Sequence, residues 1–222
     1  AMLRPFQDLA LPLGTDRLGR DVLAGLIHGA RTSLAVGFAA AAASLLVGAI
    51  IGTAAGFAGG LIDEILMRIT DAFQTVPGFL LALAMISVAG PSLPMVVLAI
   101  ALGAWPGPAR VARAEVLSLR ERDFVAAART MGMHSLEIAY REILPNALPP
   151  VLALSSVIVA AAILIEAALS FLGLGDPNRV TWGGMLAEGR TVLRSAPSLS
   201  IFPGIALVLA VLAVYLVGEG TV

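Results

Sequence analysis

The basic side chains of this sequence restrict the chemistry that the chain performs by itself. All fourteen basic residues are arginine, because the sequence contains no lysine. A nucleotide-binding loop of the Walker A type needs a lysine against the phosphates. The chain therefore has no standard Walker A site. A process driven by ATP would have to bind the nucleotide on another protein.

Catalytic and metal-binding patterns are missing from the sequence as well. There is no cysteine, which excludes disulfides, thiol catalysis and cysteine-ligated metals. The two histidines, His28 and His134, stand in separate polar segments without a neighbouring set of ligands. Neither a Gly-x-Ser-x-Gly nor a His-Glu-x-x-His motif occurs. We expect no enzyme active site, no metal site and no cofactor in this chain, and no basic patch indicates nucleic-acid binding.

One acid stands inside a long apolar run. Glu166 follows the uncharged stretch 143–165, and Ser170 comes one helical turn later. A carboxylate at the centre of a bilayer costs roughly 2.5–3.5 kcal/mol on insertion scales, so it should face protein or water. Two interpretations stay open: Glu166 and Ser170 line a translocation path, or Glu166 is a buried, hydrogen-bonded carboxyl.

The elements that must position these residues are membrane-spanning helices. The chain is 59% hydrophobic and 13% charged, with a mean hydropathy of +0.95, whereas a soluble domain carries about 25% charged residues. Its uncharged runs exceed the roughly 20 residues that a helix needs to cross the hydrocarbon core. We predict an all-α, polytopic membrane helical bundle. The five predicted spans are 33–57, 68–89, 93–112, 147–168 and 198–217.

The chain reads as one transmembrane domain, 33–222, after an extracytoplasmic leader, 1–32, whose first twenty residues look irregular. Arginine counts should orient the spans, but with five spans each side of the membrane receives seven arginines. The arginines between 110 and 141 form the densest group and lie nearest to span ends. We therefore place that group on the cytoplasmic side.

The first predicted span carries small residues at four-residue spacing. These are Ala40, Ser44, Gly48, Gly52 and Gly56. Such ridges let helix backbones approach closely in lipid. We favour packing within the chain over a dedicated dimer seam.

The segment between the third and fourth spans is unusually polar. From Arg110 to Glu142 it holds six arginines and five acids. The spacing of its apolar residues predicts two short amphipathic helices hinged at Gly132, with Ser135 as a cap for the second and Pro145 at the start of the next span. The apolar positions are Phe124, Ala127, Ala128, Met131, Leu136, Ala139, Tyr140 and Ile143. Two interpretations remain: the helices lie flat on lipid headgroups, or they dock into a partner protein.

The acids near the start of the second span form no ligand set. Glu64 and Arg68 are an i,i+4 pair of the ordinary stabilising kind. We interpret Asp63, Glu64, Arg68 and Asp71 as solvated polar residues.

Several stretches of the sequence resemble those of a known protein family. The segment from Asp123 to Pro145 resembles the "EAA" loop of ABC-importer permeases. The chain as a whole is similar to the dipeptide/oligopeptide/nickel permease family, and in particular to the "C" partner of its two-permease pair. The matching stretches, in order, are LGTDRLGRDVLAGLIHGARTSL (13–34), GFAGGLIDEILMRITDAF (56–73), ILPN (143–146), EAALSFLGLG (166–175), WGGML (182–186) and FPG (202–204).

The resemblance implies a permease subunit in the bacterial inner membrane that forms half of a pore for peptides or related small solutes. A second permease, two ATPase subunits that bind ATP and Mg²⁺, an extracytoplasmic solute-binding protein and membrane lipid are the implied partners. The cytoplasmic coupling loop, about 113–145, docks on the ATPase. The coupling residues implied are Asp123, Phe124, Ala127, Ala128, Met131, Gly132, Leu136, Leu144 and Pro145.

Two departures from the family pattern stand out. The glutamate that gives the loop its name is Ala126 here, and Asp123 is the acid one turn earlier. Family members also have a helix before the LGTD stretch and a basic tail after the last helix. We therefore expect five spans in this chain, with the family's first helix missing. A secondary transporter, which would need ion-coupling acids or broken helices at mid-membrane, and a membrane scaffold are the alternative functions.

Overall fold

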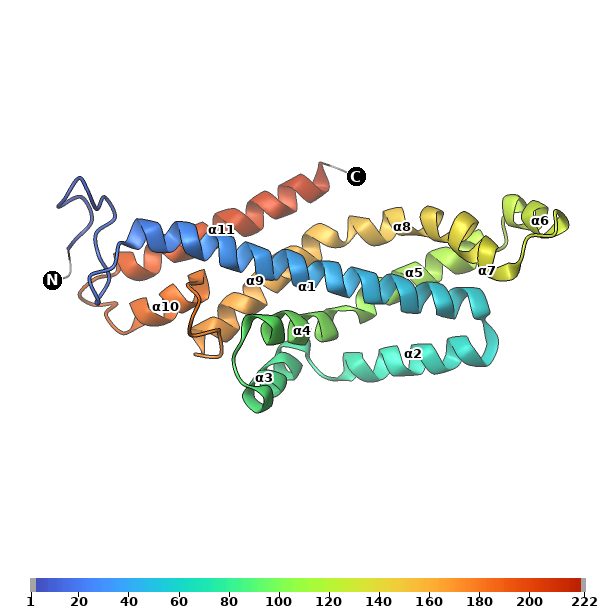
Figure 1. The fold of residues 1–222 in the computed structure, drawn as a ribbon, viewed down its shortest axis with the longest axis horizontal. Coiled ribbons are helices and arrows are strands. Elements are labelled where there is room, and N and C mark those ends of the chain that lie inside the picture. The colour runs from blue at the N-terminus through green and yellow to red at the C-terminus, as the bar shows by residue number, and fades with distance from the viewer. Residues whose placement is uncertain (1–2, 221–222) are drawn as a thin grey trace.

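The structure is a computed structural model that describes residues 3–220, except for the side chain of Glu219. Helices dominate this part of the chain, and its β-structure is limited to an isolated bridge between Thr15 and Asp21. The helices form an elongated bundle, with α10 and the N-terminal segment at one end and α6 at the other (Figure 1). The all-α class is confirmed. Residues 1–2 of the predicted leader and residues 221–222 of the predicted transmembrane domain lie outside the described residues.

The longest helix, α1, runs the length of the bundle. It spans Val22–Ala58, 37 residues, or about 55 Å at 1.5 Å per residue. The carboxylate of Asp21 caps its start by accepting a hydrogen bond from the backbone N–H of Leu23 at 2.9 Å. The predicted first span, 33–57, is therefore the later part of a longer helix, and residues 22–32 of the predicted leader are helical.

The predicted second span, 68–89, is wrong as a single helix. The chain instead forms α2 (Gly60–Thr75) and α3 (Gly78–Ala89), which meet at an angle of 81°. Pro77 disfavours the helical conformation of the residue before it, and Val76 is accordingly extended. The Pro77-Gly78 pair is a turn signal that the apolar composition concealed.

Two further predicted spans are bent. The third consists of α4 (Leu93–Ala104) and α5 (Pro106–Leu119), which meet at 44°. The fourth begins well before residue 147: the helical stretch Ser135–Ala153 meets α9 (Ser155–Phe171) at 49°. Prolines lie at or near both bends. A proline in a helix removes one backbone hydrogen bond, which allows the helix to bend there.

The remaining helices complete the bundle. They are α6 (Asp123–Thr130), α7 (Ser135–Glu137), the π-helix η1 (Ile138–Ile143), α8 (Leu144–Ala153), α10 (Trp182–Arg190) and α11 (Ser198–Glu219). Among the described residues, α1 and α11 are each long and apolar enough to cross a membrane, and three bent pairs raise the number of candidate spans to five. The short helix α10, capped by the hydroxyl of Thr181, had not been predicted.

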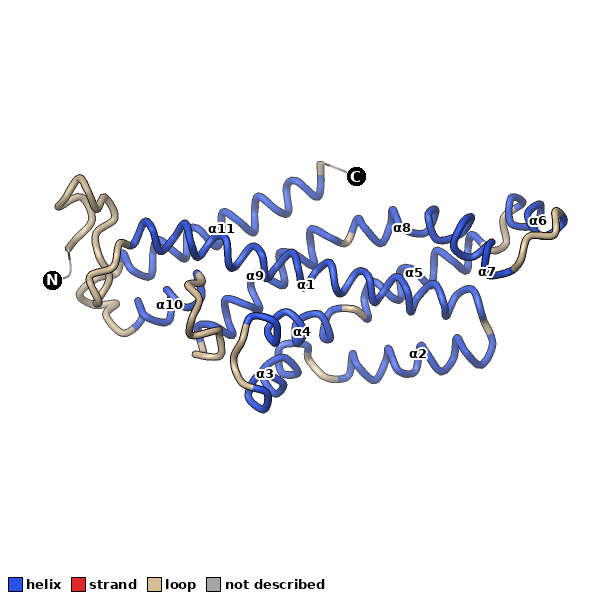
Figure 2. Tube along the Cα trace, viewed as in Figure 1, coloured by secondary structure: helices blue, strands red, loops and turns tan. Residues whose placement is uncertain are grey.

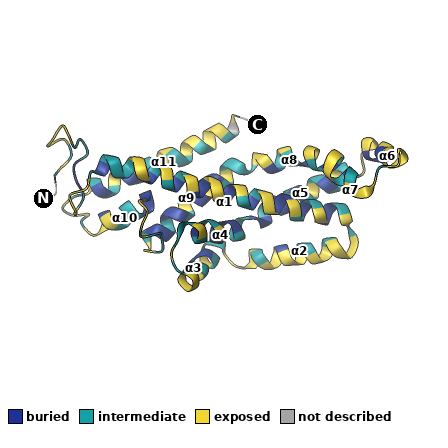
Figure 3. Ribbon diagram, in the orientation of Figure 1, coloured by how far each residue is buried: buried dark blue, intermediate teal, exposed yellow. Residues whose placement is uncertain are grey.

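The small-residue ridge of α1 lies against α4 and α5, as the preferred interpretation predicted. All five ridge residues are buried. A Cβ on Gly48 would lie 2.6 Å from Cβ of Pro108, and one on Gly56 would lie 2.9 Å from the carbonyl oxygen of Arg113. The tube view shows α5 running beside the later part of α1 (Figure 2), and both helices contain buried residues (Figure 3).

Candidate coupling site

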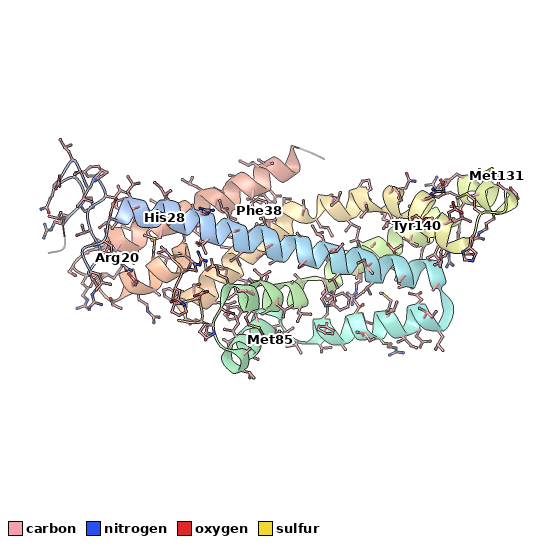
Figure 4. All side chains as sticks on the ribbon, in the orientation of Figure 1. Arg20, His28, Phe38, Met85, Met131 and Tyr140 are labelled. Carbon is pink, nitrogen blue, oxygen red and sulfur yellow. The ribbon has the colours of Figure 1, made fainter. Side chains whose placement is uncertain are left out.

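The predicted coupling loop lies at one end of the bundle. The start of the predicted range, 113–145, still belongs to α5, which continues to Leu119. Residues 120–145, here named the coupling segment, form the tip of the molecule. Figure 4 places Met131 at this tip and Tyr140 closer to the bundle, whereas Arg20 and His28 lie near the opposite end. The segment therefore projects away from the spans that it connects.

Helix α6 exposes one apolar face and buries another. Phe124, Ala127 and Met131 are exposed, and 75% of Met131 is accessible. Val125 and Ala128 are buried. The prediction that Ala128 lies on one apolar face with Phe124 and Met131 is wrong, since Ala128 turns inward with Val125, three residues earlier. Apolar side chains lie on both faces of this helix. Their spacing alone therefore does not show which face is buried.

The buried face joins the coupling segment to three other helices. Its side chains form a small apolar core with residues of α5, η1 and α8, and Phe57 of α1 packs against that core. The buried members are Val116, Val125, Ala128, Ile138, Ile143 and Ala147. A close-packed interior transmits displacement rather than absorbing it. A force on α6 therefore reaches α5 and α8 through the packed side chains of this core, mainly by way of η1.

The second half of the segment contains a π-helix. The stretch Ile138–Ile143 follows an i to i+5 pattern. This pattern places Ile138 and Ile143 on one side, and both are buried, while Leu136 and Tyr140 are exposed. The prediction assumed ordinary helical spacing and grouped Ile143 with Leu136, which is wrong. The π-turn changes the register between them.

Gly132 occupies the hinge between the two halves. Its φ of +82° lies in the left-handed region, which favours glycine. The cap of the following helix is His134 rather than the predicted Ser135: Nδ1 of His134 accepts a hydrogen bond from the backbone N–H of Leu136 at 3.3 Å. Ser135 is instead the first helical residue.

The remaining predicted coupling residues lie at the edges of the segment. Asp123 opens α6, where the helix dipole favours an acid. Ala126 is exposed one turn later, and the role of Asp123 as a substitute for the missing glutamate stays a prediction. Pro145 lies in the first turn of α8, as predicted, and Leu144 beside it is half-buried.

Glu166 is enclosed by its own chain. Only 1% of it is exposed, and its carboxylate accepts hydrogen bonds from the hydroxyls of Ser33 at 3.0 Å and Ser170 at 2.7 Å. This geometry matches the interpretation of a buried, hydrogen-bonded carboxyl. A role in a translocation path stays a prediction for Glu166 and Ser170.

The hydroxyl of Ser33 extends this network to α10. It accepts a hydrogen bond from the backbone N–H of Trp182 at 3.3 Å. The indole N–H of Trp182 also donates to the carbonyl of Leu26 at 3.0 Å. Glu166 thus helps to hold α10 against α1 and α9. Sequence reasoning missed Ser33, which lies 133 residues from Glu166 in the chain.

Comparison with known proteins identifies the class of this structure. The family model described as "binding-protein-dependent transport system inner membrane component" matches residues 44–221, which is well over half of the chain. The chain belongs to this family. It is a permease subunit of an ABC importer, a multi-pass helical protein of the bacterial inner membrane.

Individual relatives agree with this assignment. The permease is 41% identical to the dipeptide transport system permease protein DppC of Alkalihalophilus pseudofirmus over 208 residues, 93% of this chain and 68% of that protein. It is 41% identical to the probable peptide ABC transporter permease y4tQ of Sinorhizobium fredii over 99% of this chain and 77% of that protein. It is 38% identical to the glutathione transport system permease GsiD of Pectobacterium atrosepticum over 94% of this chain and 69% of that protein.

Solved structures support the fold. The permease resembles a chain of the MetNI methionine ABC transporter in an inward-facing conformation, with a TM-score of 0.71 and 19% identity over 90% of this chain and 95% of that chain. A chain of an amino acid ABC transporter gives a TM-score of 0.66 and 17% identity over 89% of this chain and 92% of that chain.

The end of the permease opposite the coupling segment contains a cavity of about 460 Å³ with several charged residues in its lining. Arg20 lies at its wall and forms ion pairs with Asp16 at 2.5 Å and with Glu188 of α10 at 2.7 Å. Burial raises the pKa of the Asp16 carboxyl, but hydrogen bonds from Arg20 and Leu18 outweigh burial and hold that pKa below its ordinary value. The negative charge of Asp16 is thereby stabilised. The arrangement fastens the N-terminal segment to α10.

Proposed function

We propose that the permease forms half of the translocation pore of an importer for short peptides or related small solutes. Relatives at about 40% identity carry the names of dipeptide, peptide and glutathione permeases. The absence of lysine from the sequence supports ATP and Mg²⁺ binding on separate ATPase subunits. A second permease, two ATPases and an extracytoplasmic solute-binding protein complete the proposed assembly in the lipid bilayer.

The coupling segment docks on the ATPase through the exposed apolar side chains of α6 and of the residue that caps its end. These are Phe124, Ala127 and Met131. An apolar face that remains in water on an otherwise charged segment is typical of a protein interaction site. The observation that carries the proposal is the opposite face of the same helix, which is locked into a buried core. Such a helix is both accessible to a partner and rigidly attached to the spans.

The rigid attachment explains how ATP binding moves the spans. Moving a two-state equilibrium from 1:99 to 99:1 requires about 5.5 kcal/mol of differential binding. A flexible segment would deform on binding and would not transmit this free energy to the spans. The core formed by Val125, Ala128 and Ile138 instead carries the displacement to α5 and α8, which move as rigid bodies in alternating access.

A crosslinking experiment tests the docking. Because the permease has no cysteine, single cysteines need no altered background. Met131→Cys is compared with Leu18→Cys, a position at the other end of the bundle that is also 75% exposed. In the assembled transporter, Met131→Cys should crosslink to a cysteine on the ATPase surface, and Leu18→Cys should not. Equal crosslinking of both variants, or of neither, would reject the docking.

An uptake experiment tests the energy source. The experiment uses proteoliposomes that contain the complete transporter and its binding protein. Accumulation of the dipeptide alanylalanine should require ATP on the side of the membrane where the coupling segment lies. Dissipating ion gradients should leave that uptake unchanged. Uptake that depends on an ion gradient and not on ATP would instead support a secondary transporter.

A further inference from the structure

The end of the bundle opposite the coupling segment, here named the outer end, is rich in arginine. Residues 3–31 and 172–197 lie towards this end (Figure 1), and together they hold seven arginines and five acids. The rest of the chain holds seven arginines and ten acids. In membrane proteins, arginine and lysine are concentrated in cytoplasmic loops. With the coupling segment in the cytoplasm, the outer end therefore carries more arginine than this bias predicts.

The acids at the outer end are already engaged by groups of the permease. Asp16 and Glu188 pair with the same guanidinium, that of Arg20, at 2.5 and 2.7 Å. A backbone N–H donates a hydrogen bond to each of the remaining acids, which are Asp8, Asp21 and Asp176. Most of the arginines at this end are therefore left without an acidic partner.

Two of these arginines flank α10. Arg179 precedes that helix and Arg194 follows it, and both are exposed. Within the described part of the chain, neither guanidinium forms an ion pair or a hydrogen bond. Exposed apolar side chains lie next to them in the sequence, namely Val180 and Leu193. Each flank of α10 thus presents a guanidinium beside an apolar side chain.

Two further arginines lie close to the same helix and have no acidic partner among the described residues. Nη1 of Arg17 donates to the hydroxyl of Thr191 at 2.9 Å, which holds Arg17 beside the end of α10. Arg190, the residue before Thr191, lies over the ring of Phe171 at 4.8 Å from its centroid. A guanidinium has five N–H donors, so both contacts leave donors available for a carboxylate. The outer arginine cluster consists of Arg17, Arg179, Arg190 and Arg194.

The backbone that carries this cluster is fixed to the bundle. In the loop before α10, Oδ2 of Asp176 accepts a hydrogen bond from the backbone N–H of Leu93 of α4 at 3.3 Å. Glu188 fastens the end of α10 to Arg20, and Trp182 fastens its start to α1. A surface that is ordered before binding loses less conformational entropy when a partner docks.

A cavity makes the outer end concave. Arg17 and Arg179 both line the cavity of about 460 Å³, whose walls come mainly from residues 16–28 and 177–189. A protruding acidic side chain of a protein can enter such a cavity, whereas a planar layer of lipid headgroups does not follow its shape. Arginine together with apolar side chains is also typical of protein interfaces. Both features favour a protein partner over a lipid surface.

We propose that the outer arginine cluster docks an acidic surface of the extracytoplasmic solute-binding protein. Guanidinium groups bind carboxylates in paired hydrogen bonds, which fix orientation as well as distance. Complementary charges also speed the encounter of two proteins. This inference rests on the proposed transport function and specifies which surface of the permease meets that partner.

A binding experiment with charge-reversed variants tests the docking. The purified solute-binding protein of the transporter is titrated onto phosphatidylcholine vesicles that contain the complete transporter, and its Kd is measured. Arg179→Glu with Arg194→Glu should raise that Kd at least ~10-fold, because acids would then face acids. Arg68→Glu makes the same kind of charge change on the exposed surface of α2 and should leave the Kd unchanged. An unchanged Kd in the double variant, or an equal rise in Arg68→Glu, would overturn the proposal.

A conservative variant separates loss of charge from damage to the surface. Arg179→Lys with Arg194→Lys keeps both positive charges but loses the planar fork of the guanidinium. It should raise the Kd less than the Glu variant does, and thermal unfolding checks that both double variants are folded. An equal rise in the two variants would contradict the proposed pairing of charges.

Lipid composition tests the alternative partner. The Kd values are measured again in vesicles that also contain phosphatidylglycerol, and the rise caused by the Glu variant should be the same in both kinds of vesicle. A rise that occurs only with phosphatidylglycerol would assign the cluster to anionic headgroups and reject the docking of the binding protein. The proposed transport function fails separately, if the wild-type transporter shows no ATP-dependent uptake although the binding protein docks.

Discussion

Arg113 and Asp63 form a two-point ion pair that joins α5 to α2. Nε and Nη2 of Arg113 donate to the two carboxylate oxygens of Asp63 at 2.5 and 2.6 Å. Paired hydrogen bonds of this kind restrict orientation as well as distance. Because α5 leads into the coupling segment and α2 buries little of its own surface, the pair is a direct mechanical link between them.

Reversing one charge of this pair should weaken the attachment of α2. Asp63→Arg places two guanidinium groups together, and we expect a loss of about 2 kcal/mol in the free energy of unfolding. The exchanged pair, Asp63→Arg with Arg113→Asp, should recover at least half of that loss. Denaturant unfolding of the purified permease measures both values. Additive losses in the double variant would show that the two residues are not coupled.

Gly132→Pro should abolish transport while the ATPase subunits remain folded and active. Proline holds φ near −65°, far from the +82° of Gly132, so the hinge must change. Gly90→Pro is the matched control: Gly90 has φ +88° and its N–H also donates to a carbonyl of the preceding helix, at 2.9 Å.

Both glycine variants lose similar backbone geometry, but Gly90 lies in the turn between α3 and α4. We expect Gly132→Pro and Gly90→Pro to lose comparable thermal stability. Gly132→Pro should reduce the amount of solute transported per ATP hydrolysed much more than Gly90→Pro does. Wild-type uptake by Gly132→Pro would refute the coupling role of the hinge.

Glu166 should matter for stability through its two acceptor oxygens. Glu166→Leu leaves the hydroxyls of Ser33 and Ser170 without their acceptor, which should lower the free energy of unfolding by about 2 kcal/mol or more. Glu166→Gln retains a carbonyl acceptor and should cost less. Thermal unfolding in detergent separates the two variants. Unchanged stability of Glu166→Leu would remove the structural role assigned to this network.

The stabilising contribution of Asp16 should depend on pH. Its pKa in the folded state lies below the ordinary value, so its charge stabilises the fold above the unfolded-state pKa, near 3.9. That contribution declines as pH falls through the lower, folded-state pKa. Asp16→Asn should therefore be less stable than the wild type at pH 7, and the difference should shrink below about pH 4. A difference that stays constant between pH 7 and pH 3 would contradict the assignment.

Several features of the coupling segment were predictable because they depend on local sequence. The apolar spacing around Gly132 indicated two short helices, and the structure has helices on both sides of that residue. The inward turn of Ala128 was not predictable. Both faces of α6 carry apolar side chains, and the core that Val125 and Ala128 form with distant residues decides which face is buried.

Helix α2 shows the same limit. Sequence reasoning joined its end to α3 in one predicted span, 68–89. The place of that end in the bundle depends on the contact of Phe73 with Trp105, 32 positions later in the chain. A contact of this kind leaves no periodic signal in the sequence.

The sequence by itself determined that this is a multi-span membrane protein and that the given chain contains no standard Walker A motif, because the length of apolar runs and the absence of lysine are one-dimensional properties. It also marked the polar segment that projects from the bundle. Only the tertiary structure decided which side of each helix is covered, where the spans bend, and that Ser33 reaches Glu166. Those outcomes depend on packing between residues distant in the chain, where the same side chains permit more than one arrangement.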